Sequence, residues 1–417
     1  MMTHNPRLIN IDDFDYNLPD SYIATHPVSP RDAARLLIAG KDPGQIEESV
    51  FSNLGAYLPS DALLLVNETR VVKARLIFSN QKGALIEIFL LNPIEPSDIQ
   101  QAFSQPTSCI CKVLVGNARR WKEGPLEMKL HTGQDHATLT AELQGRADNA
   151  FVVKFSWSPA HLSFGQLLEA AGRMPLPPYI KRAATFQDTI DYQTVYAQHD
   201  GSVAAPTAGL HFTDEVMQSL ATKGIITSKV VLHVGAGTFK PVSVTALTEH
   251  TMHSEQIIIH KQTVETLISR INKPRILVGT TTVRTIESLY WYGVRLLTDG
   301  NNAPFCIEQW MPYDDRYNKG ISIVDALEAV LEKINQQNTG YASGETRIII
   351  APGYQYKLTD LLITNFHQPR STLLLLVSAF IGPLWKTVYQ HAISHNFRFL
   401  SYGDACLFFP EKRNLDR

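Results

Sequence analysis

Between residues 65 and 157 the chain carries a succession of short strand patterns with no helical pattern between them. The apolar runs at 71–78, 84–91, 110–115 and 151–155 are rich in β-branched and aromatic residues, and Asn, Gly, Lys and Pro separate them. Short strands at this spacing are typical of a small β-barrel or sandwich. We therefore expect residues 65–157 to form an inserted small β-barrel domain.

The sequence after this stretch alternates between helical and strand patterns. Such alternation predicts a mixed α/β domain whose ligand lies where loops gather at strand ends. Since 417 residues exceed one ordinary core, we expect this larger α/β domain to be built from both ends of the chain, residues 1–64 and 158–417. The expected helices lie at 164–172, 212–223, 262–272 and 324–336, and expected strands at 225–234 and 347–351.

The charge balance excludes a chain that is basic throughout. There are 38 Lys and Arg residues and 40 Asp and Glu residues, a formal net charge of −2, so a nucleic-acid partner has to meet a local basic patch. The four cysteines are irregularly spaced and predict neither a zinc site nor a redox motif. No leader is visible, and the apolar run at 373–381 is shorter than the ~20 residues of a membrane span, which favours a cytoplasmic protein.

Two runs rich in small residues, 201–213 and 233–242, are predicted to form the wall of a binding site. Glycine, alanine and threonine let backbone N–H groups approach a ligand closely. Histidines in the same runs can transfer protons near neutral pH. The candidate residues in these runs are Pro206, Thr207, His211, His233, Gly235, Gly237 and Thr238.

A third candidate histidine, His253, precedes Glu255, which would orient the imidazole or act as a second base. The alternative is that each of these imidazoles caps a strand or satisfies a buried carbonyl group. His250 and His253 lack the glutamate that would complete a metal-hydrolase motif. No metal centre is therefore expected.

The segment 279–284 follows a strand and opens a helix. Its N–H groups and hydroxyls then lie at the positive end of the helix dipole, which suits a carboxylate or a phosphate. The alternative is a plain hydroxyl cap, with Arg284 pairing with Glu287 one turn further along the helix. The candidate ligand-binding residues in this segment are Thr280, Thr281, Thr282 and Arg284.

Three other places carry polar residues in an apolar or rigid setting. The segment 360–372 predicts a binding loop with Asn365, His367, Ser371 and Thr372 as candidates. Asp404 lies in a largely apolar segment, where a carboxylate needs a partner or a function. In the proline-rich segment around Tyr179, Lys181 and Arg182 an aromatic ring and two cations would stack a base and contact phosphate, although a solvated turn has the same composition.

Taken together, these segments resemble one family, the S-adenosylmethionine:tRNA ribosyltransferase-isomerases of queuosine biosynthesis. The resemblance is collinear from about residue 14 to the end of the chain. It includes PRDAARLL at 30–37, NETRVVKARL at 67–76 and MPLPPYIKR at 174–182. The remaining matching segments are 192–197, 202–212, 233–242, 252–255, 278–288, 364–380 and 397–405.

The resemblance implies a two-domain enzyme with S-adenosylmethionine as co-substrate, tRNA as partner and no metal. The family moves the ribosyl moiety, and not the methyl group, to the aminomethyl nitrogen of 7-aminomethyl-7-deazaguanine at the wobble position of tRNA. Adenine and methionine are released and epoxyqueuosine is formed.

The resemblance also suggests roles for the candidate residues. His211 or His233 would remove a proton from the carbon next to the sulfonium, and Asp404 or His367 would assist the departure of adenine. Thr280, Thr281 and Thr282 with Arg284 would hold the methionine carboxylate.

Some positions depart from the family pattern. Lys73 stands where proline is usual, and the chain has extra sequence around 93–108 and 299–344. These departures leave open a divergent paralogue with another acceptor, or a non-catalytic RNA-binding protein.

Overall fold

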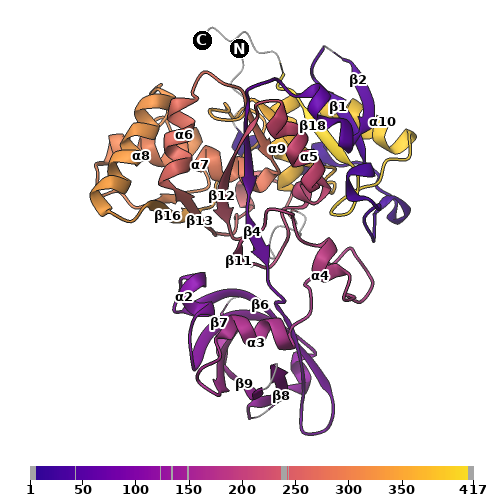
Figure 1. The fold of residues 1–417 in the computed structure, drawn as a ribbon, viewed down its shortest axis with the longest axis vertical. Coiled ribbons are helices and arrows are strands. Elements are labelled where there is room, and N and C mark those ends of the chain that lie inside the picture. Colours follow the sequence, from indigo (N-terminus) through magenta and orange to yellow (C-terminus); the bar gives the residue numbers. More distant parts are fainter. Residues whose placement is uncertain are drawn as a thin grey trace.

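The computed structural model describes residues 6–42, 44–122, 124–132, 135–147, 150–235, 242 and 244–411. Its strands form sheets of ten, six and two strands, and helices pack around the largest of them (Figure 1). The fold is mixed α/β, with a large sheet and a separate, nearly closed antiparallel sheet. This agrees with the fold class that the sequence predicts.

The ten-stranded sheet brings together strands from both ends of the chain. Its central strands β12, β3, β14 and β17 run parallel. Apolar residues dominate β3, β14 and β17, as is typical of strands covered on both faces, whereas β12 carries Thr227, Ser228 and Lys229 in its first half. The order across the sheet is β15 (Cys306–Ile307), β16 (Tyr341–Thr346), β13 (Glu255–His260), β12 (Ile226–Leu232), β3 (Leu63–Asn67), β14 (Arg275–Val278), β17 (Leu361–Asn365), β18 (Ala405–Phe408), β1 (Arg35–Ala39) and β2 (Ile46–Val50).

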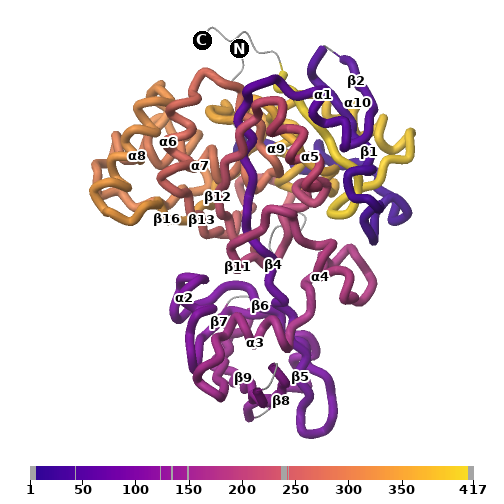
Figure 2. Tube along the Cα trace, viewed as in Figure 1, coloured from indigo at the N-terminus to yellow at the C-terminus, as the bar shows by residue number. Residues whose placement is uncertain are grey.

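The two ends of the chain meet in this sheet. β1 pairs in parallel with β18, and β2 folds back on β1 as the edge strand. Figure 2 shows the indigo N-terminal and yellow C-terminal segments side by side. The larger sheet therefore depends on pairing between segments more than 360 residues apart, such as Leu36 and Ala405.

The six-stranded sheet contains strands from a single stretch of the chain. Alternate residues of β5 and β7 are buried, as expected for strands with one face on a core. That core includes Leu76, Ile88 and Phe155, and helix α3 (Phe164–Ala171) packs against it through Phe164. The order is β5 (Arg75–Ser79), β6 (Leu85–Glu95), β7 (Ser108–Gly116), β10 (Ala150–Ser158), β9 (Asp135–Ala147) and β8 (Leu126–Thr132).

A short two-stranded sheet, β4 (Thr69–Val71) with β11 (His199–Ser202), lies between the two larger sheets (Figure 1). The ten helices of the described residues are α1 (Leu54–Tyr57), α2 (Ile99–Phe103), α3 (Phe164–Ala171), α4 (Asp188–Asp191), α5 (Asp214–Thr222), α6 (Lys261–Ser269), α7 (Thr280–Asp299), α8 (Ile323–Gln337), α9 (Thr372–Ile381) and α10 (Leu384–Ser394).

Helix α7 is the central helix of the larger part. It is buried almost throughout, from Thr280 to Val294, and therefore has no solvent-exposed face over this length. Gly293 lets it approach α8 closely, because a Cβ there would lie 2.0 Å from the carbonyl oxygen of Ala326. The carboxylate of Glu287 is fully buried but accepts hydrogen bonds from the Tyr354 and Thr359 hydroxyls.

Most expected elements are confirmed, and two differ. The helices at 164–172, 212–223, 262–272 and 324–336 correspond to α3, α5, α6 and α8, and the strand at 225–234 to β12. The prediction of a strand at 347–351 is wrong, because β16 ends at Thr346. The apolar residues that follow are buried between two core clusters and pair with no strand among the described residues. β3 spans the expected boundary at 65 but belongs to the large sheet, so the six-stranded sheet begins at Arg75.

In the part of the chain that the structure describes, no single helix is long and apolar enough to cross a membrane. Helices α9 and α10 pass such a test only as a pair, and the chain bends by 114° between them.

The close approach of α7 and α8 gives a test of the fold. In Gly293→Ala the new methyl group meets rigid backbone, so we expect a loss of about 1–3 kcal/mol in the free energy of unfolding, although alanine is the better helix former. Gly145→Ala is the matched control, because nothing lies within 4 Å of its Cβ position. Urea unfolding measures both; equal midpoints would contradict the packing described.

Candidate functional site

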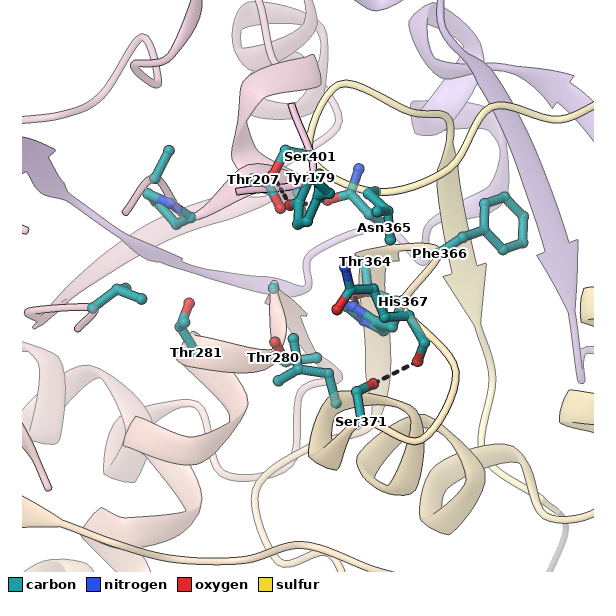
Figure 3. A pocket seen from close by; sticks show the side chains of 18 residues that line it. Tyr179, Thr207, Thr280, Thr281, Thr364, Asn365, Phe366, His367, Ser371 and Ser401 are labelled. Atoms are coloured by element: carbon teal, nitrogen blue, oxygen red, sulfur yellow. Dashed lines mark hydrogen bonds between the residues drawn. The ribbon is translucent and has the colours of Figure 1, made fainter. Parts of the chain in front are cut away.

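A cavity lies at the carboxyl ends of β14 and β17, where parallel strands leave room for a ligand. Water-sized molecules have about 60 Å³ of room in it, within about 640 Å³ of space between atoms that includes open solvent, and Figure 3 shows side chains from several segments pointing into it. The lining residues are Tyr179, Ala205, Pro206, Thr207, Ala208, Val234, Gly279, Thr280, Thr281, Thr364, Asn365, Phe366, His367, Gln368, Ser371, Leu373, Leu400 and Ser401.

Two helices begin at this cavity. Gly279 precedes α7 with φ of 87°, a conformation that favours glycine, and Thr280 and Thr281 follow in the wall. Ser371 caps α9 by accepting a hydrogen bond from the Leu374 N–H at 3.2 Å. The positive ends of both helix dipoles therefore face the cavity, which favours an anionic group in a ligand.

The Thr281 hydroxyl is buried and has no hydrogen-bond partner among the residues that the structure describes. A buried hydroxyl without a partner is costly, so a ligand in the cavity can supply the missing bond. Thr282 differs, since its hydroxyl donates to the Val278 carbonyl within the helix at 2.5 Å. Thr372 is partly buried and lies outside the lining.

A hydrogen-bonded chain runs from the cavity into the core through Asn365. The Thr207 hydroxyl donates to Asn365 Oδ1 at 2.9 Å, and Asn365 Nδ2 lies 3.0 Å from Nε2 of His211. His211 is buried beneath this amide, where its ring packs against Phe51. Burial, with a smaller contribution from Arg31, lowers the pKa of His211 to about 4, so the imidazole is neutral at physiological pH.

His367 is the histidine that lines the cavity directly. Its Nε2 lies 2.9 Å from the Thr364 hydroxyl, and its backbone is held by Tyr389, whose hydroxyl accepts from the His367 N–H at 3.1 Å. Burial lowers the pKa of His367 to about 3. This side chain is a neutral hydrogen-bonding group at the cavity wall.

His233 and His253 lie outside the cavity lining. His233 is buried against Gly201, since a Cβ at position 201 would lie 2.6 Å from the His233 ring. Nδ1 of His233 lies 3.3 Å from the Thr69 hydroxyl. Its Nε2 is buried and has no hydrogen-bond partner in the described part of the chain, and burial lowers the pKa of His233 to about 4. His253 is exposed. Neither residue is brought next to His367.

Arg284 does not reach the cavity. It is buried and forms an ion pair with Glu255, and its Nε donates to the Ile348 carbonyl at 3.2 Å. The alternative pairing with Glu287 is wrong, since that carboxylate is occupied by the 354–359 segment. Pairing with Arg284 also leaves Glu255 unsuited to act as a base beside His253.

Asp404 supports the cavity from behind. Its two carboxylate oxygens accept the backbone N–H groups of Arg35 at 3.0 Å and of Arg398 at 2.7 Å. Burial raises its pKa, which these hydrogen bonds oppose. The loop that Asp404 holds places Leu400, at φ of 69°, and Ser401 in the wall.

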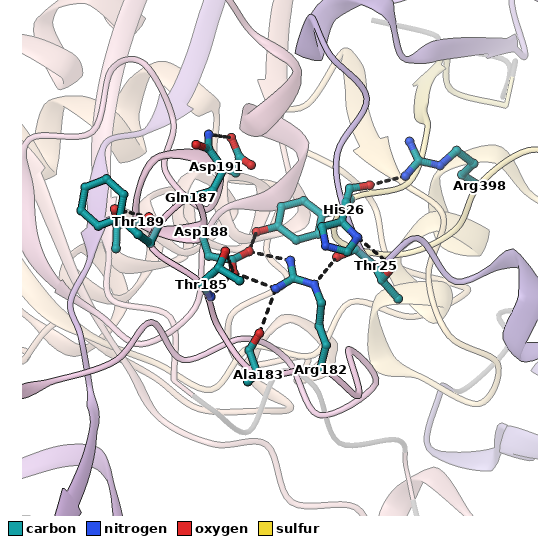
Figure 4. A network of polar contacts seen from close by, with 12 residues as sticks. Thr25, His26, Arg182, Ala183, Thr185, Gln187, Asp188, Thr189, Asp191 and Arg398 are labelled. Carbon is teal, nitrogen blue, oxygen red and sulfur yellow. Dashed lines mark hydrogen bonds and ion pairs between the residues drawn. The ribbon is translucent and has the colours of Figure 1, made fainter.

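The predicted nucleic-acid residues separate into different environments. Tyr179 lines the cavity, with its hydroxyl 2.6 Å from Ser401 Oγ. Lys181 is exposed and pairs with Asp20 at 2.7 Å. Arg182 is held by Asp188 through two hydrogen bonds, of 2.6 and 2.7 Å (Figure 4), so its charge is already compensated within the protein.

Of the glycine-rich run, Gly235 is partly buried just beyond Val234, whereas Gly237 and Thr238 lie outside the described residues. The sequence analysis missed Thr364, Gln368, Leu400 and Ser401. Thr364 and Gln368 flank predicted residues of the binding loop, and their polarity was a usable signal. Leu400 and Ser401 carry no such signal, because the turn that exposes them depends on Asp404.

Two groups of side chains that could bind a metal ion lie outside the cavity lining. Among the described residues, two groups of three histidine and carboxylate side chains come together, namely Glu68, His199 and His260, and Glu48, His391 and His395. None of these residues lines the cavity.

The class of the protein follows from comparison with known sequences. Residues 11–408 match the model of the queuosine biosynthesis protein family, and the chain therefore belongs to this family. Its relatives include proteins named S-adenosylmethionine:tRNA ribosyltransferase-isomerase. That of Magnetococcus marinus is 36% identical over 95% of this chain and 93% of its own length, and that of Thermotoga maritima is 38% identical over 96% and 99%.

A solved structure, S-adenosylmethionine tRNA ribosyltransferase from Thermotoga maritima, covers 95% of this chain and 100% of its own at 28% identity, with a TM-score of 0.45.

The buried histidines make stability depend on pH. The unfolded chain takes up a proton at His233 near pH 6.5 but the folded chain only near pH 4, so the histidine's contribution to stability is present above pH 6.5 and is lost as the pH falls. Between these values the free energy of unfolding should fall more steeply in the wild type than in His233→Gln, by about 1.4 kcal/mol per pH unit. Denaturant unfolding at several pH values measures the difference; parallel curves would contradict it.

Proposed function

We propose that this protein transfers the ribosyl moiety of S-adenosylmethionine to 7-aminomethyl-7-deazaguanine at the wobble position of tRNA and isomerises it. The products are epoxyqueuosine in tRNA, adenine and methionine. Family membership supports the reaction, and one structural observation carries it: two helix N-termini and an unpartnered hydroxyl face one cavity.

The cavity suits the carboxylate of a ligand such as S-adenosylmethionine. Its described lining has hydroxyl, amide and imidazole groups but no charged side chain. The methionine carboxylate would lie at the start of α7, on the N–H groups and on the Thr281 hydroxyl. Because Arg284 is paired with Glu255, the helix end and the hydroxyls would hold the carboxylate without a cation.

Proton transfer would involve His367 and the Asn365–His211 chain. A sulfonium acidifies the adjacent 5′ C–H, so a neutral imidazole at the wall can accept its proton. His367 is placed to do this or to hydrogen-bond adenine as it leaves. His211 acts through Asn365, whose amide it orients, and is thus a positioning residue. Asp404 shapes the wall by holding the loop with Ser401.

We further propose that residues 1–64 and 158–417 form the catalytic domain, and that residues 65–157 form an inserted domain. The six-stranded sheet, which begins at Arg75, and its own apolar core support an inserted domain, while β3 places its first residue after Asn67. The tRNA would meet Tyr179 and Lys181 at the cavity mouth. The Lys181–Asp20 pair is exposed and worth at most about 1 kcal/mol, so a phosphate can displace the carboxylate. Modification of tRNA would place the protein in the cytoplasm.

A different acceptor is the second candidate, and Lys73 favours it. Where the family has proline, Lys73 pairs with Glu169 at 2.7 Å beside an open groove between β4 and α3. Arg70 in the same groove faces Asp200 at 3.8 Å. Because carboxylates balance its cations, this groove is a weak surface for a polyanion such as tRNA.

The reaction itself is the direct test. Incubation with S-adenosylmethionine and tRNA carrying the aminomethyl-deazaguanine should release adenine, measured by chromatography, and yield the epoxide nucleoside, measured by mass spectrometry. Adenine release that needs the free base but is indifferent to tRNA would favour the second candidate. Binding of tRNA without any adenine release would defeat both.

The role of the Thr281 hydroxyl is tested by its isosteric replacement. Thr281→Val should weaken S-adenosylmethionine binding by about 1.5–3 kcal/mol, or roughly ten- to hundredfold in Kd, because a hydrogen bond to a charged group is lost. Thr285→Val makes the same change one turn along α7, where the hydroxyl donates to the Thr281 carbonyl away from the cavity, and should leave Kd unchanged. Calorimetric titration of both variants measures this; equal affinities would argue against the carboxylate site.

A further inference from the structure

Helix α10 and strand β2 bring two histidines and a glutamate together on the surface. His391 and His395 are one helical turn apart, and their rings stack with centroids 3.8 Å apart. Nε2 of His391 lies 2.7 Å from Oε1 of Glu48. One potential ligand atom from each of the three side chains lies within 4.8 Å of the other two. We propose that Glu48, His391 and His395 form a site for a divalent transition-metal ion, of the class of Zn²⁺.

The distances suit the insertion of an ion. Zinc binds imidazole nitrogen and carboxylate oxygen at about 2.0–2.2 Å, so two ligands on a tetrahedral ion lie about 3.4 Å apart. The observed 2.7 Å between His391 and Glu48 is a hydrogen bond whose proton a metal ion replaces. All three side chains are at least partly exposed, so small rotations bring the remaining nitrogen into range. A water molecule would complete four-coordination.

Outer hydrogen bonds orient two of the three ligands. Nδ1 of His395 donates to the His391 carbonyl at 2.9 Å, which leaves the lone pair of His395 on Nε2. Arg35 Nη2 donates to Oε2 of Glu48 at 2.5 Å, which leaves Oε1 directed at His391. Metal-binding histidines and carboxylates in proteins are oriented by such partners.

The charges around the site act in both directions. Glu48 supplies an acidic ligand, and its Oε1 already lies 2.7 Å from Nε2 of His391. The positive charge of Arg35 opposes a cation at this site. Two other contacts share the Arg35 guanidinium with Glu48: it stacks on the Phe397 ring at 3.7 Å, and it donates to the His395 carbonyl at 2.7 Å. Imidazole with one carboxylate favours zinc, nickel and copper over magnesium and calcium.

The site is connected to the wall of the cavity. The backbone N–H of Arg35 donates to Asp404, and Asp404 fixes the loop with Leu400 and Ser401. An ion joining β2 to α10 would brace this frame from the outside. The proposal concerns stability and does not rest on the reaction proposed for the cavity.

Titration of metal-free full-length protein tests the site. One equivalent of Co²⁺ should give the visible absorption of a nitrogen- and oxygen-ligated ion, and Zn²⁺ should abolish it by displacement and raise the thermal midpoint. His391→Gln and His395→Gln should each weaken binding at least about tenfold, since even loss of an outer-shell partner has that effect. Glu48→Gln keeps an acceptor for Arg35 but removes the anionic ligand, and should weaken binding as well.

His136→Gln is the matched control. His136 is exposed and contacts the ring of His131 at 4.6 Å, but the pair belongs to no three-ligand group among the described residues, so this variant should bind like the wild type. Failure of the wild type to bind one equivalent would overturn the proposal. So would binding that survives in all three site variants, or an equal loss in His136→Gln.

Discussion

The parallel pairing of β14 with β17 is the constraint on which the cavity depends. Val278 pairs with Ile363, and the Gly279 N–H extends the ladder to the Ile363 carbonyl at 2.7 Å. The next residues of the two strands are those that reach the ligand space, Thr280 on one side and Thr364 and Asn365 on the other. A shift of one residue would exchange the faces of the sheet on which Thr364 and Asn365 lie.

Burial then decides which polar groups the cavity keeps. The charged residues of α7 point away from it, Arg284 toward Glu255 and Glu287 toward the 354–359 segment. Each buried charge has partners, as the cost of desolvation requires. Near the cavity the helix therefore offers its N–H groups and two hydroxyls, and the buried imidazoles His211 and His367 remain neutral. The result is a polar wall of neutral groups with a positive helix-end field.

Local sequence features were informative where the chemistry was local. The segments 279–284 and 360–372, which the sequence predicts to bind a ligand, both contribute to the cavity wall, through Thr280, Thr281, Asn365 and His367. His391 and His395 stand at the i, i+4 spacing of helical metal ligands, which the expectation of no metal centre overlooked. The third potential ligand, Glu48, lies on β2, more than 340 residues earlier in the chain, and only the fold brings it to His391.

The sequence by itself determined the mixed α/β class, the β-rich insertion and most of the polar segments around the cavity, because periodicity and small-residue runs are properties of neighbours along the chain. Tertiary structure decided the rest. Arg284 and Asp404 were indistinguishable in sequence from ligand-binding residues, yet one is neutralised by Glu255 and the other holds backbone N–H groups of Arg35 and Arg398. The physical reason is that the free energy of a buried charge is set by the partners that the fold places around it, and those partners are distant in sequence.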